Sequence, residues 1–162
     1  MKVYSGKGDA GETLDLSGRK VSKNDSVIHL LGTLDELNSH IGLVKAMLSN
    51  DDSWQFAWKS ACNFMEKVQK NLMKMMSHVS DEKSEKYFFT DTEISVMEKE
   101  IDRISKNIPE HHDLIIPGKN IIEAQTQIAR TIARRAERLF FAAVKEHQLC
   151  PRAGVYLNRL SD

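Results

Sequence analysis

Four arginines that could bind a polyanion, with one glutamate among them, fall within nine positions of one helical stretch: Arg130, Arg134, Arg135, Glu137 and Arg138. At about 100° per residue, the first two arginines and the glutamate lie within roughly 60° of one another. Guanidinium groups bind phosphate oxygens bidentately and stay charged at any relevant pH. The array therefore favours a polyphosphate or nucleotide site. The alternative is a solvated helix face laced with salt bridges.

A glycine-rich motif near the amino terminus is a second candidate for phosphate binding. Residues 6–11 match the pattern G-x-G-x-x-G, but a dinucleotide fold needs a preceding strand and an immediately following helix, which this sequence does not provide. Glycines still let backbone N–H groups approach an anion closely, and Lys7 and Lys23 add positive charge. We therefore predict a loop that cradles phosphate, with an unstructured terminus as the alternative.

Two adjacent carboxylates, Asp35 and Glu36, lie within a helical turn of apolar residues. A di-iron helix bundle needs Glu-x-x-His pairs on two helices, and the sequence has none. We predict instead that Asp35 pairs with an arginine on a neighbouring helix. The His111-His112 pair is more typical of a polar loop than of a metal site.

Composition limits the classes of function. The 162 residues are 41% hydrophobic and 28% charged, and Lys+Arg and Asp+Glu are both 23, which gives a net charge of +0. A neutral chain of this size indicates one globular domain and argues against general binding to nucleic acid or anionic membranes. Two cysteines, Cys62 and Cys150, favour a reducing cytoplasm. Neither a membrane span of roughly 20 apolar residues nor a signal peptide is indicated.

Helical periodicity of apolar residues predicts the elements that position these groups. The first helix is expected from Ser26, as N-cap, to Leu48, and the second over residues 54–79. The second helix carries a methionine and aromatic stripe that is more typical of a core than of a cofactor site. A charged connection at 80–90 follows.

A third helix is expected from a cap at Thr90 or Asp91, with Ile104 on its apolar stripe, to Pro109. The arginine helix is expected over residues 120–147, with four residues on its apolar side: Ala129, Ile132, Ala136 and Leu139. Pro151 should break that helix, and a short last helix should begin at Gly154. No strand of useful length is indicated.

Four long amphipathic helices with short links predict an all-α fold, an antiparallel up-and-down bundle of the ferritin-like kind with a short fifth helix. Residues 1–25 form a loop ahead of the bundle at 26–162, and together they make a single domain.

Three sequence blocks taken together resemble a known family. They are Gly8-Asp9-x-Gly11-x-Thr13 with Val21-Ser22-Lys23, then Gly32-Thr33-x-Asp35-Glu36-Leu37-Asn38-x-x-Ile41-Gly42, and Ala129-Arg130-Thr131-x-x-Arg134-Arg135-Ala136-Glu137-Arg138 with Tyr156–Asp162. Their order and spacing resemble the PduO-type ATP:cob(I)alamin adenosyltransferases over nearly the whole chain. The resemblance implies a trimeric five-helix bundle that transfers the 5′-deoxyadenosyl group of ATP to cob(I)alamin and releases triphosphate.

The resemblance also implies site residues and ligands. ATP, with Mg²⁺, would be bound between subunits by Ser5, Gly6, Lys7, Gly8, Thr13, Lys23, Arg134, Arg135, Glu137, Arg138 and Asn158. Arg130, Arg134 and Asp35 would take the catalytic roles, with Asp35 paired to Arg130 across or near the subunit interface. Leu114 would lie on the corrin side. The resemblance also implies two possible protein partners, a reductase and a B12-dependent client enzyme.

The chain departs from the family pattern mainly on the corrin side. Leu114 stands where the family has the phenylalanine that helps displace the lower axial base of cobalamin, Lys119 stands where it has a glycine, and Gln127 replaces a histidine. In the N-terminal loop, Lys7 replaces a threonine and Lys20 an arginine. These departures leave slow turnover or a changed corrinoid preference open, and with them an alternative function as a non-catalytic trimer that binds ATP or cobalamin as a sensor or delivers the cofactor. A helical interaction module without a ligand is the third hypothesis.

Overall fold

The structure is a computed structural model that describes residues 4, 6, 8–49, 55–109 and 114–162. Its elements in chain order are β1 (Glu12–Leu14), β2 (Lys20–Ser22), α1 (Ser26–Ser49), α2 (Gln55–Ser80), the 3-10 helix η2 (Glu85–Tyr87), α3 (Asp91–Ser105), α4 (Ile121–Ala143) and α5 (Pro151–Leu160). The described part of the chain is mostly helical, as the sequence predicts.

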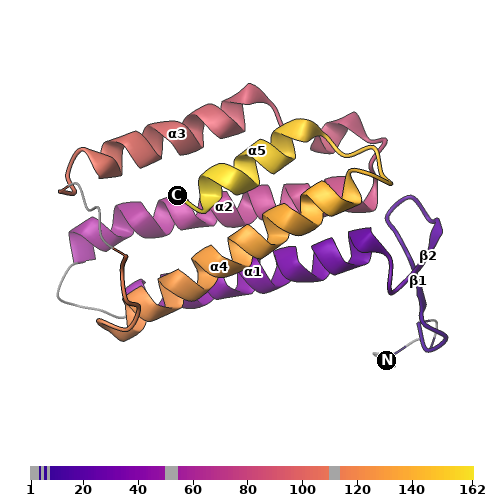
Figure 1. Cartoon of the computed structure of the whole chain (residues 1–162), viewed down its shortest axis with the longest axis horizontal. Helices are drawn as coiled ribbons and strands as arrows, with labels where there is room; N and C mark the ends of the chain where they lie inside the picture. Colours follow the sequence, from indigo (N-terminus) through magenta and orange to yellow (C-terminus); the bar gives the residue numbers. More distant parts are fainter. Residues whose placement is uncertain (1–3, 5, 7, 50–54, 110–113) are drawn as a thin grey trace.

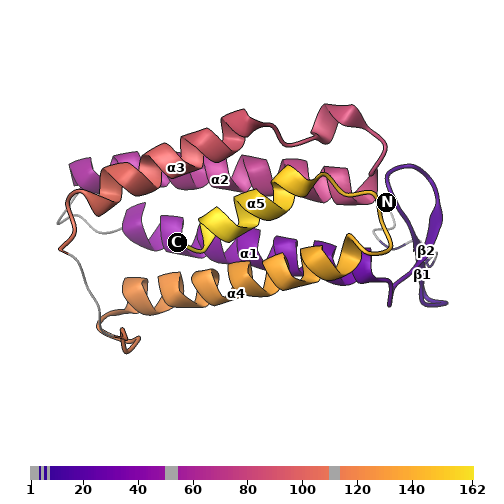
Figure 2. The same cartoon turned by 45° about the horizontal axis from the view of Figure 1, so that its top comes forward.

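Successive α-helices run in alternating directions along the long axis of the molecule (Figures 1 and 2). Helix α1 packs against both α2 and α4, while α5 lies between α3 and α4. Helix α5 is short, so the carboxyl terminus lies midway along the other helices (Figure 1). The predicted site residues lie in the N-terminal loop and hairpin and on α1, α4 and α5, apart from Leu114 in the segment before α4.

The apolar stripes predicted from the periodicity form the core. Seven residues of α1 at helical spacing are buried: Val27, Leu30, Leu34, Leu37, Ile41, Val44 and Leu48. Val68, Leu72, Met75 and Val79 of α2 face them, and Trp58, Ala61 and Met65 are half-buried. Trp54, predicted on the same stripe, lies outside the described residues. Ile104 of α3 departs from the prediction because it is 43% exposed, beyond the reach of the short α5.

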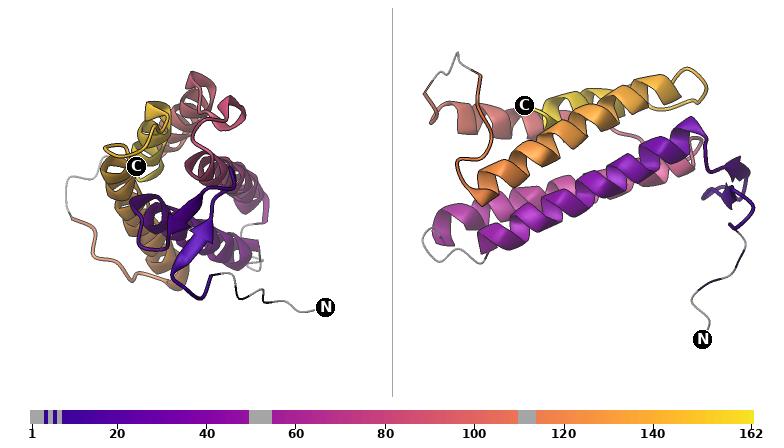
Figure 3. Two further views of the ribbon diagram at one scale, coloured as in Figure 1. Left: turned by 90° about the vertical axis from the view of Figure 1, so that its right-hand side faces the viewer. Right: turned by 60° about the horizontal axis from the view of Figure 1, so that its bottom comes forward.

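A two-stranded antiparallel hairpin, β1 paired with β2, differs from the strand-free loop expected for residues 1–25. Thr13 pairs with Val21 at its centre, and Val21 is buried. Each strand has three residues, too few to show a recognisable alternation in the sequence. The hairpin lies at the end of the molecule where α1 begins and α2 ends (Figure 3).

Some helix termini also differ from expectation, while others match it. The Asp25 side chain, rather than Ser26, accepts the Val27 N–H at the start of α1, at 3.0 Å. Helix α3 ends at Ser105, before Pro109, because Asn107 binds the Arg103 carbonyl at 2.8 Å. Thr90 caps α3 as predicted, in a reciprocal capping box with Glu93.

The arginine helix α4 ends at Ala143 instead of 147 because the chain turns there toward α2. Pro151 does not merely break a helix, since it occupies the first turn of α5, where its missing N–H costs nothing. Gly154 therefore lies inside α5, tightly against Phe140 of α4.

Candidate functional site

Helix α4 presents its arginines on the side opposite the core. Arg130, Arg134, Arg135 and Arg138 are exposed, whereas Ala129, Ile132 and Ala136 are buried and Leu139 is half-buried. The sequence prediction missed three further core residues of this helix, Ala133, Phe140 and Ala143, which complete the buried stripe. The packing of small alanines lets α1 and α5 approach α4 closely, and this fixes the direction in which the arginines project.

The four exposed arginines of α4 differ in their side-chain partners. Arg135 forms an ion pair with Glu36 of α1, and the Arg130 Nε donates to the Gln127 Oε1 at 2.7 Å. In the part of the chain that the structure describes, Arg134 and Arg138 have neither a hydrogen-bond nor an ion-pair partner. Two guanidinium groups are therefore available to bind an anion.

Asn158 of α5 lies against Glu137 of α4, so the structure brings together two residues predicted for one site. The Asn158 Nδ2 donates to the Glu137 Oε1 at 2.9 Å, and the Arg159 Nη1 donates to the Asn158 Oδ1 at the same distance. Arg159 in turn pairs with Glu98 of α3 at 3.0 Å. Arg159 and Glu98 lie 61 positions apart, and sequence reasoning missed this contact because no local pattern marks it.

Two residues of α2, the half-buried Asn71 and the fully buried His78, fix the position of α5. The Asn71 Nδ2 donates to the Tyr156 Oη at 3.2 Å, and burial raises the pKa of Tyr156 to about 12. The Nε2 of His78, which is fully buried, accepts the Cys150 N–H at 2.8 Å. Burial lowers the pKa of His78, against the charges of Glu82 and Asp81, and this keeps the ring neutral and able to accept that bond.

Two glycines shape the backbone of the N-terminal loop, which the sequence predicts to be a phosphate cradle. Gly6 and Gly11 have φ of +70° and +80°, a conformation that side chains rarely allow. A Cβ on Gly8 would lie 2.9 Å from the Lys23 Nζ, so the ammonium lies directly over this glycine. The predicted residues Ser5 and Lys7 lie outside the described residues. Thr13 lies in strand β1.

Asp35, predicted to pair with an arginine, is exposed and has no ion-pair partner among the described residues, and neighbouring Glu36 binds Arg135 instead. The loop at Gly8–Lys23 is joined to Arg130–Arg138 by no hydrogen bond or ion pair within the described chain. The two halves of the predicted ATP site are therefore separate within one subunit.

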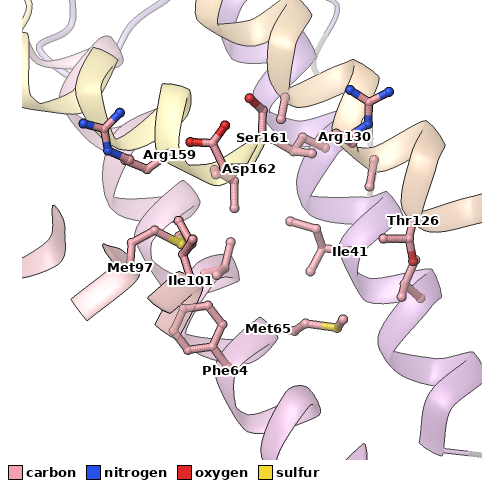
Figure 4. Close-up of a pocket in the computed structure, with 16 residues that line it drawn as sticks. Ile41, Phe64, Met65, Met97, Ile101, Thr126, Arg130, Arg159, Ser161 and Asp162 are labelled. Atoms are coloured by element: carbon pink, nitrogen blue, oxygen red, sulfur yellow. The ribbon is translucent and has the colours of Figure 1, made fainter. Parts of the chain in front are cut away.

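An apolar pocket of about 260 Å³ opens beside Arg130, beyond the carboxyl end of α5. Figure 4 shows Ile41, Phe64, Met65, Met97 and Ile101 around it, with Arg130, Arg159 and Asp162 at its rim. The walls come from α1, α2, α3 and α4, because α5 covers only part of the core. The pocket offers an apolar surface next to a cation.

The segment before α4 carries the predicted corrin-side residue. Leu114 is 97% exposed and contributes nothing to the core. The Gly118 and Lys119 N–H groups both donate to the Glu123 Oε2, at 2.7 and 3.1 Å. These backbone bonds lower the pKa of Glu123. The adjacent His111 and His112 lie outside the described residues. Among the residues described, no three His, Cys, Asp or Glu side chains gather to hold a metal.

The whole chain matches proteins of one kind. Residues 3–162 match the family model described as cobalamin adenosyltransferase. The corrinoid adenosyltransferase of Bacillus subtilis is 35% identical, with 100% of this chain and 82% of that protein covered. The corrinoid adenosyltransferase PduO of Citrobacter freundii is 31% identical, and the chain spans 47% of its length.

Solved structures agree with the sequence relatives. A variant PduO-type ATP:corrinoid adenosyltransferase from Lactobacillus reuteri, complexed with cobalamin and ATP, superposes with a TM-score of 0.85 at 29% identity. The match covers 99% of this chain and 87% of that one. A second variant of that enzyme, complexed with ATP, gives a TM-score of 0.84 at 28% identity, over 98% of this chain and 87% of that one.

The chain belongs to the cobalamin adenosyltransferase family. Within it, the relatives and solved structures are those of the PduO type, ATP:corrinoid adenosyltransferases. The family and the class of enzyme predicted from the sequence are confirmed. Among the described residues, no helix combines the length and the apolar character needed to cross a membrane.

Proposed function

We propose that this chain transfers the 5′-deoxyadenosyl group of ATP to cob(I)alamin and releases triphosphate. The electron pair of cobalt(I) forms the cobalt–carbon bond while the bond from C5′ to the phosphate oxygen breaks, and the triphosphate leaves with the electron pair of that broken carbon–oxygen bond. The observation that carries the proposal is the pair of unpartnered guanidinium groups, Arg134 and Arg138, on a helix matched to this family.

The proposed ATP site combines the N-terminal loop with α4 and α5. The loop would bind the phosphates through Ser5, Gly6, Lys7, Gly8, Thr13 and Lys23. The Lys23 ammonium above Gly8 supports this assignment, because it places a cation beside backbone that can approach an anion closely. The rest of the site would consist of Arg134, Arg135, Glu137, Arg138 and Asn158.

The proposed catalytic residues stabilise charge and need not supply a nucleophile. Cobalt(I) is itself the nucleophile, so the substrate carries the difficult chemistry. Arg130 and Arg134 would oppose the charge that grows on the leaving triphosphate, as a preorganised electrostatic clamp. Asp35 would hold Arg130 in place from the neighbouring subunit. Gln127 already restrains the Arg130 guanidinium within the chain.

Mg²⁺ fits this site as an ion bound to the nucleotide. The described residues gather no carboxylate or histidine cluster, so phosphate oxygens would be its main ligands, in keeping with its preference for oxygen. The Thr13 hydroxyl is a candidate ligand from the loop. When bound, Mg²⁺ would neutralise phosphate charge.

The corrin side of the site is proposed to include Leu114. Its side chain is almost fully exposed, so it is free to contact a large apolar ligand. The Lactobacillus reuteri structure that holds both cobalamin and ATP superposes over nearly the whole chain, which supports cobalamin as the second substrate.

We propose that the active form is a homotrimer of up-and-down, ferritin-like bundles, each a single domain of residues 1–25 and 26–162. The separation of the loop from the α4 arginines within one chain supports a site between subunits, because a loop of one subunit could then meet the arginines of the next. Two free cysteines, Cys62 and Cys150, support a reducing cytoplasm. A reductase and a B12-dependent client enzyme would act before and after this step.

The test is direct. Purified protein is incubated with ATP, Mg²⁺ and chemically reduced cobalamin, and adenosylcobalamin formation is followed by absorbance, with a reaction lacking ATP as control. We expect product that depends on ATP. Bound ATP and cobalamin without product would instead indicate the sensor or delivery function, and restored turnover in Leu114→Phe would locate the defect on the corrin side.

A further inference from the structure

The carboxylate of Glu82 joins two segments far apart in the chain. Glu82 lies just after α2, and its side chain is 16% exposed. Its Oε2 accepts the Gln148 N–H at 2.8 Å and lies 3.6 Å from the His147 Nδ1. Its Oε1 lies 3.5 Å from the Arg19 Nη1. One side chain therefore contacts both the hairpin and the turn between α4 and α5.

The first of these segments is the hairpin of the N-terminal loop. Arg19 lies in the turn between β1 and β2, and the Asp15 carboxylate binds its Nε at 2.9 Å. Burial opposes ionisation of Asp15, but hydrogen bonds from Ser17 and Arg19 outweigh burial and lower its pKa. The Leu16 N–H donates to the Ser80 carbonyl at 3.2 Å, which brings this turn onto the end of α2. Glu82 thus meets a hairpin turn that is already ordered.

The second segment is the turn that starts α5. Gln148 and Cys150 both donate backbone N–H bonds to side chains at the end of α2, to Glu82 and His78 respectively. The helix that follows carries Asn158. All three segments meet at the hairpin end of the molecule (Figures 1 and 3).

We infer that Glu82 is a positioning residue for the nucleotide, because its carboxylate fixes the N-terminal hairpin on its own bundle, at the turn that starts α5, and so sets where the loop meets the arginines of the neighbouring subunit. The hairpin segment carries Thr13 and Lys23 of the proposed ATP site, and α5, which follows the turn, carries Asn158, so the inference rests on the proposed function. Loss of the carboxylate would leave the Gln148 N–H without its acceptor in the chain and release Arg19 from the segment that follows α2. The two segments would then vary in relative position, and binding of ATP would weaken while the corrin side would be unaffected.

The experiment compares Glu82→Ala with a matched control, Glu100→Ala. The Glu100 side chain is 17% exposed and pairs with Arg103 of α3, away from both segments. We expect Glu82→Ala to raise KM for ATP by about tenfold, with kcat and KM for cobalamin within about twofold of the parent, because misplaced binding groups weaken one substrate selectively. Glu100→Ala should leave all three parameters unchanged.

A second variant keeps the test decisive if Glu82→Ala folds poorly. Glu82→Gln retains an oxygen that can accept the Gln148 N–H and removes only the charge facing Arg19, so its KM for ATP should lie between those of Glu82→Ala and the parent. Amide hydrogen exchange of residues 12–22 should quicken in Glu82→Ala and not in Glu100→Ala.

Some results would overturn the inference. If the parent binds ATP and both Glu82 variants bind it equally well, Glu82 is structural only and the proposed function stands. A parallel fall in kcat and in the affinities for ATP and for cobalamin would indicate general destabilisation and would overturn the inference too. If the parent protein itself binds no ATP, the proposed function and this inference fail together.

Discussion

Arg134 and Arg138 project from the exposed side of α4 with no side-chain partner among the described residues, whereas Arg130 and Arg135 are each held by a neighbour. An exposed cation without a partner contributes little to folding, since nothing is lost when it is removed. Its value lies in binding. The two roles can therefore be separated by substitution.

Replacing Arg134 with alanine should lower kcat/KM for ATP by about 100-fold, as for other donors that face a charge developing in the transition state. The free energy of unfolding should change by no more than about 0.5 kcal/mol. Steady-state adenosylation and urea denaturation measure the two quantities. Arg103→Ala on α3 is the control for loss of an exposed arginine. A comparable loss of activity in the control would contradict the assignment.

Sequence reasoning predicted the residues of α4 that face outward because helical periodicity is local. It did not predict which partner each arginine would have. Glu36, rather than the adjacent Asp35, binds Arg135, and the choice depends on the rotation of α1 against α4. Glu98 and Glu82 were missed for the same reason, since their partners lie 61 and 66 positions away. Long-range contacts of this kind leave no mark on either segment alone.

The contact of α5 with α4 is set by a glycine. A Cβ on Gly154 would lie 2.8 Å from the Phe140 ring, closer than non-bonded carbons approach. Gly32 of α1 is a contrasting case, because a Cβ there would meet nothing within 4 Å in this chain. Packing against Phe140 therefore requires glycine at position 154, whereas no contact within this chain requires it at position 32.

Gly154→Ala should lower the free energy of unfolding by about 1–3 kcal/mol, because α5 must move away from Phe140. Gly32→Ala should raise it by about 0.5–1 kcal/mol, since alanine favours the helix and meets no obstacle. Chemical denaturation followed by circular dichroism measures both. Equal effects of the two substitutions would show that the tight approach of α5 to α4 does not limit stability.

Element boundaries were harder to predict than the elements themselves. The four long helices follow from their apolar stripes, and Thr90 caps α3 as expected. Helix α4 ends early at Ala143 because His147 and Gln148 bind Asp25, just before α1, and Glu82, just after α2, which the sequence of α4 cannot show. The sequence predicts that Pro151 breaks the arginine helix, yet proline is equally suited to the first turn of the next helix, where it lies.

The proposed homotrimer requires a contact between chains, and Asp35 and Arg130 are its candidate residues. Asp35 is exposed and without an ion-pair partner in the described residues, and Arg130 is exposed with only Gln127 bound. A pair between them across subunits would join neighbouring copies at the site. It would also explain why one chain leaves both side chains facing solvent.

We expect the parent protein to sediment with three times the 18.4 kDa mass of one chain. Asp35→Arg and Arg130→Asp should each weaken association, because each would place like charges opposite one another. The double exchange should restore association by reversing the pair. Analytical ultracentrifugation at several concentrations decides between these outcomes, with circular dichroism to confirm helical content. Unchanged mass in both single variants would exclude this contact.

Helix α4 carries a second place where an anion could settle. At its start, Gly118, with φ of +114°, and Lys119 direct two backbone N–H groups at one point, where the positive end of the helix dipole also acts. The Glu123 carboxylate already occupies that point. The Glu123 carboxylate thus neutralises the positive amino-terminal end of α4. We therefore expect a triphosphate that approaches α4 to bind at the arginines and not at this end of the helix.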